Sequence, residues 1–182
     1  MRERIMRRRM RLLACVAAAV AVIVALLASG LGRDPSVTAS PLVGRVAPNF
    51  TLPQLDGGPV TLSKLRGQVV VINFWASWCA ECKVEQAALD QAWQQFQDAG
   101  VVVIGVNFED SATAARSYVR TADVTYPVVE DSASRTALAY GLHGIPETFV
   151  VNQAGRIVNR VIGPVGGASL AGEINSMLAS SR

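Results

Sequence analysis

Two cysteines separated by two residues are the side chains of this sequence best suited to chemistry. Cys79 and Cys82 lie in the stretch NFWASWCAECKVE, residues 73–85. The same spacing can hold zinc, attach a haem covalently, or cycle between a dithiol and a disulfide. The neighbouring residues must distinguish these three uses.

The ligands that zinc or haem would need are missing. A structural zinc site takes four ligands, and beyond residue 31 the sequence adds only one histidine, His143, to the two cysteines. A c-type haem attachment needs C-x-x-C-H, and Lys83 stands in the histidine position. A purely structural disulfide closing so short a loop would add little stability. We therefore expect no metal, and no cofactor other than a redox-active disulfide, Cys79–Cys82.

The flanking sequence favours redox chemistry. Residues 69–76, VVVINFWA, form the continuous apolar run of a strand buried on both faces, and a helix is expected from about residue 79 to residue 99. Cys79 then falls in the first turn of that helix, where free backbone N–H groups and the helix dipole favour a thiolate. We expect Cys79 to attack a substrate and Cys82, the more buried thiol, to resolve the mixed disulfide.

The N-terminus predicts insertion into a membrane. Residues 1–11 carry six arginines and one glutamate, a net charge of +5, and residues 12–31 contain no charge and no proline. Twenty such residues can cross a bilayer as a helix, and this length favours a retained anchor over a cleaved signal. The arginines should stay cytoplasmic, which places the catalytic domain outside the cell membrane. The remaining residues sum to −2, so we expect no nucleic-acid partner.

The rest of the chain predicts a short linker and one α/β domain. Residues 32–43 are rich in Pro, Ser, Thr and Gly, and residues 44–182 form the domain. A small hairpin is expected around Asp56-Gly57-Gly58. The remaining order of elements predicts a sheet with helices on its faces. The further strands are expected at 101–108, 147–152 and 156–162, and the further helices at 111–120, 133–140 and 169–179.

Two motifs carry a family resemblance. FWASWCAEC and the later GIPETFVV resemble the thioredoxin fold, and the anchor together with APNFTLPQLDGGPVTLSKLRGQVVVINFWASWC resembles the membrane-tethered TlpA/ResA/DsbE (CcmG) thiol:disulfide oxidoreductases. The resemblance covers residues 44–180. It implies a thioredoxin fold with an N-terminal β-hairpin extension, preceded by one transmembrane helix.

The resemblance also implies roles for particular residues. Pro146 matches the family's cis-proline, which lies beside the cysteines and leaves a backbone edge free for an extended substrate. Trp78, Ile145 and Glu147 complete the substrate-binding residues that we expect. Glu85 matches a glutamate associated with proton handling, because it follows the second cysteine by three residues on nearly the same helical face.

Two residues depart from the family pattern. Glu81 replaces the common proline before the second cysteine, and its negative charge would disfavour the neighbouring thiolates, which leans toward a reductase. Asn73 stands where thioredoxins carry a buried aspartate, so proton transfer must use Glu85, Glu147, water or the substrate.

The expected function is that of a protein-disulfide reductase that keeps apocytochrome c, or another disulfide-bearing protein, reduced. Its electrons would come from a transmembrane thiol donor. One alternative is a dithiol oxidase of secreted proteins. Another is a copper-binding chaperone that uses the two cysteines and His143. A peroxidase is disfavoured because Ile72 and Ala76 occupy the positions where peroxiredoxins carry Pro and Thr or Ser.

Overall fold

The computed structural model describes residues 16, 18–20 and 41–180. The chain divides into two units, Met1–Pro35 and Ser36–Arg182, and the described residues of the first unit are helical and exposed. Within the described ranges, no helix has the length and apolar character needed to span a membrane. Most of the segment 12–31 lies outside these ranges, so the transmembrane anchor stays a prediction.

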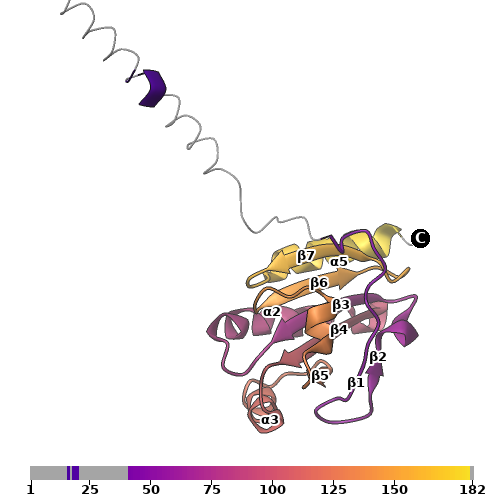
Figure 1. Cartoon of the computed structure of the whole chain (residues 1–182). Helices are drawn as coiled ribbons and strands as arrows, with labels where there is room; N and C mark the ends of the chain where they lie inside the picture. The colour runs from indigo at the N-terminus through magenta and orange to yellow at the C-terminus, as the bar shows by residue number, and fades with distance from the viewer. Residues whose placement is uncertain (1–15, 17, 21–40, 181–182) are drawn as a thin grey trace, which may run out of the picture. The chain divides into compact units, whose positions relative to one another are not determined.

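A five-stranded sheet forms the centre of the second unit, in the order β5-β4-β3-β6-β7 (Figure 1). The parallel strands are β3 (Val69–Trp75), β4 (Val101–Phe108) and β5 (Val128–Asp131), and the antiparallel strands are β6 (Glu147–Val151) and β7 (Ile157–Ile162). The central strand β3 pairs with β4 along its whole length. Its carboxyl end therefore lies in the middle of the sheet edge.

Four helices and a small hairpin complete the described part of this unit. The hairpin joins β1 (Thr51–Leu52) to β2 (Val60–Thr61) in antiparallel pairing, as the sequence predicted. Two short 3₁₀ helices, Leu62–Leu65 and Gln97–Ala99, follow β2 and α2. The helices are α2 (Ala80–Phe96), α3 (Ala112–Thr121), α4 (Arg135–Ala139) and α5 (Gly167–Ser180).

The sheet carries a hydrophobic cluster on each face, which explains the unbroken apolar run of β3. Alternate β3 residues face opposite sides: Val69, Val71 and Trp75 pack in one cluster with residues of α2, α3 and α5. Val70 and Phe74 pack in the other cluster, with residues of α4 and of the segment before the hairpin. A strand covered on both faces is held rigidly, so the site at its end has a fixed base.

The sequence predicted most of these elements correctly. Strand β5 was missed because only four residues form it, VVED, and half of them are acidic. The strand is held by its pairing with β4, and its four residues alone show no hydrophobic pattern typical of a strand. Helix α4 is shorter than expected, five residues in place of eight.

Gly105 of β4 offers a test of this packing. An added Cβ would lie 2.9 Å from Trp75 Nε1 and 3.0 Å from Tyr126 Cε2. In Gly105→Ala, overpacking should cost about 1–3 kcal/mol of stability, whereas alanine in a strand gains only roughly 0.5–1 kcal/mol over glycine. The net free energy of unfolding should therefore fall. Denaturant titration measures the change. Gly58→Ala, where the added Cβ meets nothing within 4 Å, should stay within about 0.5 kcal/mol of the wild type.

Candidate active site

The two cysteines form a disulfide where β3 gives way to α2. Strand β3 ends at Trp75 and α2 begins at Ala80, with Cys79 as its N-cap residue. The Cα atoms of Cys79 and Cys82 are 5.4 Å apart, and the N–H of Cys82 donates a hydrogen bond to Cys79 Sγ at 3.1 Å. The sulfur thus takes the place of the usual capping oxygen at the positive end of the helix.

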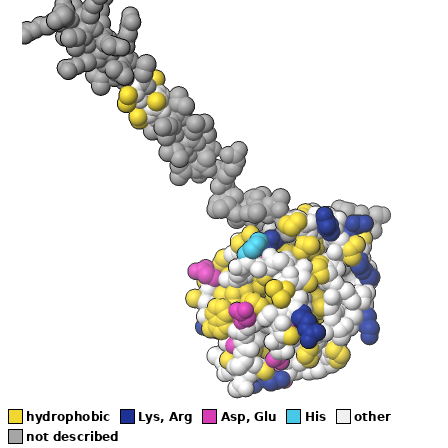
Figure 2. Space-filling model, viewed as in Figure 1, with side chains coloured by type: hydrophobic (Ala, Val, Ile, Leu, Met, Phe, Trp, Pro, Cys, Tyr) yellow, Lys and Arg dark blue, Asp and Glu magenta, His cyan; other side chains and the backbone are white. Residues whose placement is uncertain are grey.

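The disulfide is buried and flanked by one exposed aromatic ring. Cys79 is 6% exposed and Cys82 5%, so in the oxidised form the expected difference in burial between the two cysteines is absent. Trp78 is 60% exposed, whereas Trp75 is packed in the core. Hydrophobic side chains gather on the face of the molecule shown in Figure 2.

The turn after β4 holds the loop that carries the cysteines. The N–H of Ser77 donates to Asp110 Oδ2 at 2.7 Å, and Trp78 Nε1 donates to the carbonyl of Glu109 at 2.9 Å. Burial alone would raise the pKa of Asp110, but hydrogen bonds from Ser77, Asn107 and Ser111 outweigh it and lower the pKa below the usual value. Asp110 is therefore an ionised anchor for this loop.

No sequence pattern predicted a role for Glu109 or Asp110. The signal that could have found them is their position directly after the strand 101–108. Because neighbouring parallel strands end at the same edge of a sheet, residues after β4 lie beside residues after β3.

The Ile145–Pro146 peptide bond is cis, as the resemblance implied. The carbonyl of Pro146 accepts a hydrogen bond from the N–H of Gly163 at 3.0 Å. Within residues 41–180, the backbone N–H and C=O of Ile145 have no hydrogen-bond partner. This short edge is free to pair with another extended chain.

An open pocket of about 420 Å³ brings Trp78 and Ile145 together. The two residues lie on its wall with His143, from the same loop as Ile145, and with Glu109, from the turn after β4. The expected substrate-binding residues Trp78 and Ile145 thus share one surface. Glu147 does not line the pocket: it is fully buried and its carboxylate pairs with Arg160.

Comparison with known proteins identifies the family. Residues 43–160 match the model of the AhpC/TSA family. The chain belongs to this family. DsbE of Allochromatium vinosum, a thiol:disulfide interchange protein, is 37% identical over 158 residues, 85% of this chain and 86% of that protein. The thiol-disulfide oxidoreductase ResA of Bacillus subtilis is 35% identical over 120 residues, 66% of this chain and 67% of ResA.

A solved structure agrees with these relatives. The thiol:disulfide interchange protein of the thioredoxin family from Chlorobium tepidum superposes with a TM-score of 0.67 at 26% identity, covering 73% of this chain and 95% of that one. The thioredoxin-like fold is therefore confirmed. This member of the AhpC/TSA family is a thiol:disulfide oxidoreductase of the TlpA/ResA/DsbE type.

Glu85 is the buried carboxylate of this oxidoreductase that lies on the same face of α2 as Cys82. It is 1% exposed, and its two oxygens accept hydrogen bonds from Asn73 Nδ2 at 2.6 Å and from the N–H of Val165 at 2.8 Å. Burial raises the pKa of Glu85 from 4.5 to about 7, against the lowering effect of the bonds from Val165 and Asn73. Near neutral pH the group can both take up and release a proton.

Asn73 holds Glu85 from the centre of β3. Its Nδ2 also donates to Thr148 Oγ1 of β6 at 3.0 Å, so the amide is fixed by two strands. Both donors to Glu85 are neutral, and neutral hydrogen bonds compensate a buried charge only in part. Asn73 itself carries no ionisable proton, so the titratable group of this hydrogen-bonded pair is Glu85.

The raised pKa predicts how stability depends on pH. With a pKa of 4.5 in the unfolded chain and about 7 in the folded oxidised protein, the folded state binds more protons between these values. The contribution of Glu85 to stability is therefore greatest below about pH 4.5 and falls by about 3 kcal/mol as the pH rises to about 7.

Glu85→Gln removes this dependence. The free energy of unfolding of the variant, minus that of the wild type, should rise by about 3 kcal/mol between pH 4 and pH 8 in denaturant titrations. Asp98→Asn changes an exposed carboxylate at the end of the same helical segment and should give a difference that stays within about 0.5 kcal/mol at every pH. A flat difference for Glu85→Gln would contradict the raised pKa.

Proposed function

We propose that this protein is an extracytoplasmic protein-disulfide reductase that acts on the cysteine thiols of apocytochrome c. The proposal is carried by one continuous segment, residues 78–85. It supplies Trp78, which lines a pocket with Ile145, then Cys79, whose sulfur caps α2, and then Glu85, a buried carboxylate with a pKa raised to about 7. Such a site suits a protein disulfide better than a buried small molecule, because the pocket is open and lies beside an unpaired edge.

The reaction begins at Cys79. In the reduced protein its thiolate attacks one sulfur of the substrate disulfide, and the other substrate sulfur leaves as a thiolate. The thiol of Cys82 passes its proton to the carboxylate of Glu85 and attacks Cys79 Sγ. The substrate sulfur bound to Cys79 then leaves as a thiolate, and the Cys79–Cys82 disulfide forms. Two electrons have passed to the substrate. The proton on Glu85 and one from solvent complete the substrate dithiol.

The electrons must be replaced from outside the domain. We infer that the N-terminal segment anchors the domain to the outer face of the membrane, since residues 1–11 are basic and residues 12–31 apolar. A protein anchored there would face a compartment without an assured soluble reductant. A transmembrane thiol carrier is therefore the proposed electron donor.

The copper-chaperone alternative loses support from the position of His143. Its Nδ1 lies 3.0 Å from Arg160 Nη2, so a copper ion bound at this ring nitrogen would displace that contact and lie beside a guanidinium cation. The dithiol-oxidase alternative uses the same site and differs only in reduction potential.

The first test is mixed-disulfide trapping in cells. Cys79→Ser should abolish activity, because it removes the attacking thiolate. Cys82→Ser should accumulate a covalent complex with substrate, because nothing displaces the substrate from Cys79. The complex is identified by mass spectrometry, and Cys79→Ser/Cys82→Ser serves as the control that traps nothing. If the trapped complexes contained no apocytochrome c, the thiol–disulfide reaction would still stand, but apocytochrome c would be rejected as the substrate.

The second test is the reduction potential of the Cys79–Cys82 pair, measured against glutathione or dithiothreitol buffers. A reductase should lie nearer to thioredoxin, at about −270 mV, than to the oxidant DsbA, at about −120 mV. A value near that of DsbA would favour the dithiol oxidase of secreted proteins in its place.

A further inference from the structure

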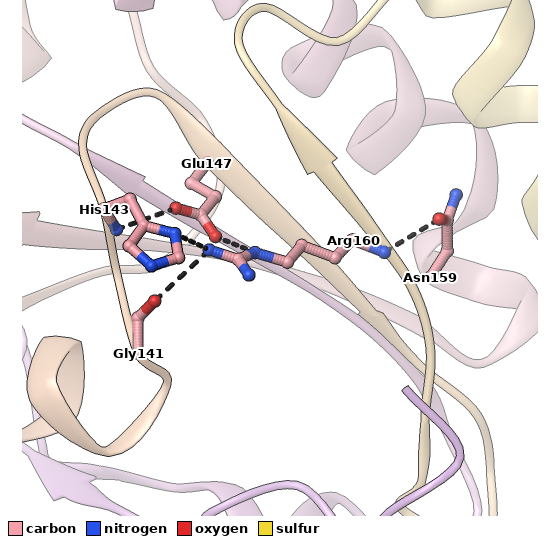
Figure 3. A network of polar contacts seen from close by, with 5 residues as sticks. All are labelled: Gly141, His143, Glu147, Asn159 and Arg160. Atoms are coloured by element: carbon pink, nitrogen blue, oxygen red, sulfur yellow. Dashed lines mark hydrogen bonds and ion pairs between the residues drawn. The ribbon is translucent and has the colours of Figure 1, made fainter. Parts of the chain in front are cut away.

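A buried ion pair supports the loop that leads into the cis-proline (Figure 3). Glu147 directly follows Pro146, and its Oε1 pairs with Arg160 Nε of β7. The side chains are 0% and 3% exposed. Glu147 Oε2 also accepts the N–H of His143, at 3.3 Å. The first residue of β6 is thus tied both to the neighbouring strand and to the loop before it.

Arg160 ties the same loop a second time. Its Nη2 donates to the carbonyl of Gly141 at 3.2 Å and approaches Nδ1 of His143 at 3.0 Å. Three hydrogen bonds therefore connect the loop 141–145 to the buried pair, and two of them involve His143. The last residue of this loop is Ile145, whose backbone N–H and C=O have no partner in the part of the chain that the structure describes.

The partner of His143 fixes the form of its ring. An arginine side chain can only donate hydrogen bonds, so Nδ1 must act as the acceptor and the proton of the neutral ring sits on Nε2. A protonated imidazole would lose the acceptor and place a second cation beside the guanidinium. The other charged groups facing His143 are Glu147, which Arg160 already neutralises, and Glu109 across the pocket.

We propose that His143 is a positioning residue: in its neutral form it holds the Ile145–Pro146 edge in place for an extended peptide disulfide. This inference rests on the proposed function, because it concerns protein substrates. It assigns His143 no part in the sulfur chemistry. The binding of a peptide should therefore depend on His143, whereas the reactivity of Cys79 should not.

Three substitutions distinguish the role of Nδ1 from that of Nε2 in His143. In His143→Asn the side-chain oxygen takes the place of Nδ1 and can accept from Arg160. In His143→Gln the polar atoms lie one bond further out, near the place of Nε2, and in His143→Phe no acceptor is left. Because His143 is exposed, all three variants should fold, and circular dichroism checks this.

The measurement is a single-turnover reaction of the reduced full-length protein with an excess of an oxidised peptide that contains C-x-x-C-H. The rate as a function of peptide concentration yields a half-saturating concentration and a limiting rate. Loss of one hydrogen bond at the loop should raise the half-saturating concentration about 3- to 10-fold in the Phe and Gln variants. The Asn variant should stay within about twofold of the wild type, and all limiting rates should agree within about twofold.

Two results of comparing the variants would overturn the proposal. One is a Phe variant that binds the peptide as well as the wild type does, and the other is an Asn variant as weak as the Phe variant. The aromatic disulfide 5,5′-dithiobis(2-nitrobenzoic acid), which has no peptide backbone, should react equally fast with all four proteins. A wild type that reduces this compound but not the peptide would refute the proposed function, and the positioning role with it. Equal peptide binding by all variants would refute only the role of His143.

Discussion

The chemistry of this oxidoreductase depends on the free N–H groups at the start of α2. A helix leaves its first N–H groups without backbone partners, and Cys79 Sγ accepts one of them. The same geometry stabilises a negative charge on that sulfur when the disulfide is opened. Because β3 is buried on both faces and leads directly into α2, the sulfur is held at a fixed point of the sheet edge.

Three carboxylates near this point lie in three different electrostatic environments. Asp110 is half-buried and accepts several hydrogen bonds, which lower its pKa and keep it charged. Glu85 is fully buried with only neutral donors, which leaves its pKa near 7. Glu147 is fully buried with a guanidinium as its partner. The first anchors a loop, the second suits proton transfer, and the third supports the cis-proline edge.

The Glu147–Arg160 pair illustrates why a buried charge is retained beside a working site. Removing two charges from water is costly, and apolar side chains of similar size often give equal or better stability. The pair here bonds to His143 and also to the carbonyl of Gly141, so it fixes a loop that has few backbone hydrogen bonds of its own. Its value lies in the geometry of that loop more than in stability.

The sequence by itself determined the redox pair, the central strand and the helix that begins beside Cys79, because these follow from local spacing and periodicity, and its motifs carried the resemblance to the family. It also identified Glu85, since positions three apart share a helical face. Only the tertiary structure decided the partners of these residues. The contacts of Asp110 with Ser77 and of Arg160 with His143 join segments 33 and 17 residues apart, and Glu85 reaches Val165 across 80 residues. Burial and hydrogen bonding between distant segments set the charge of each group, and no local pattern encodes them.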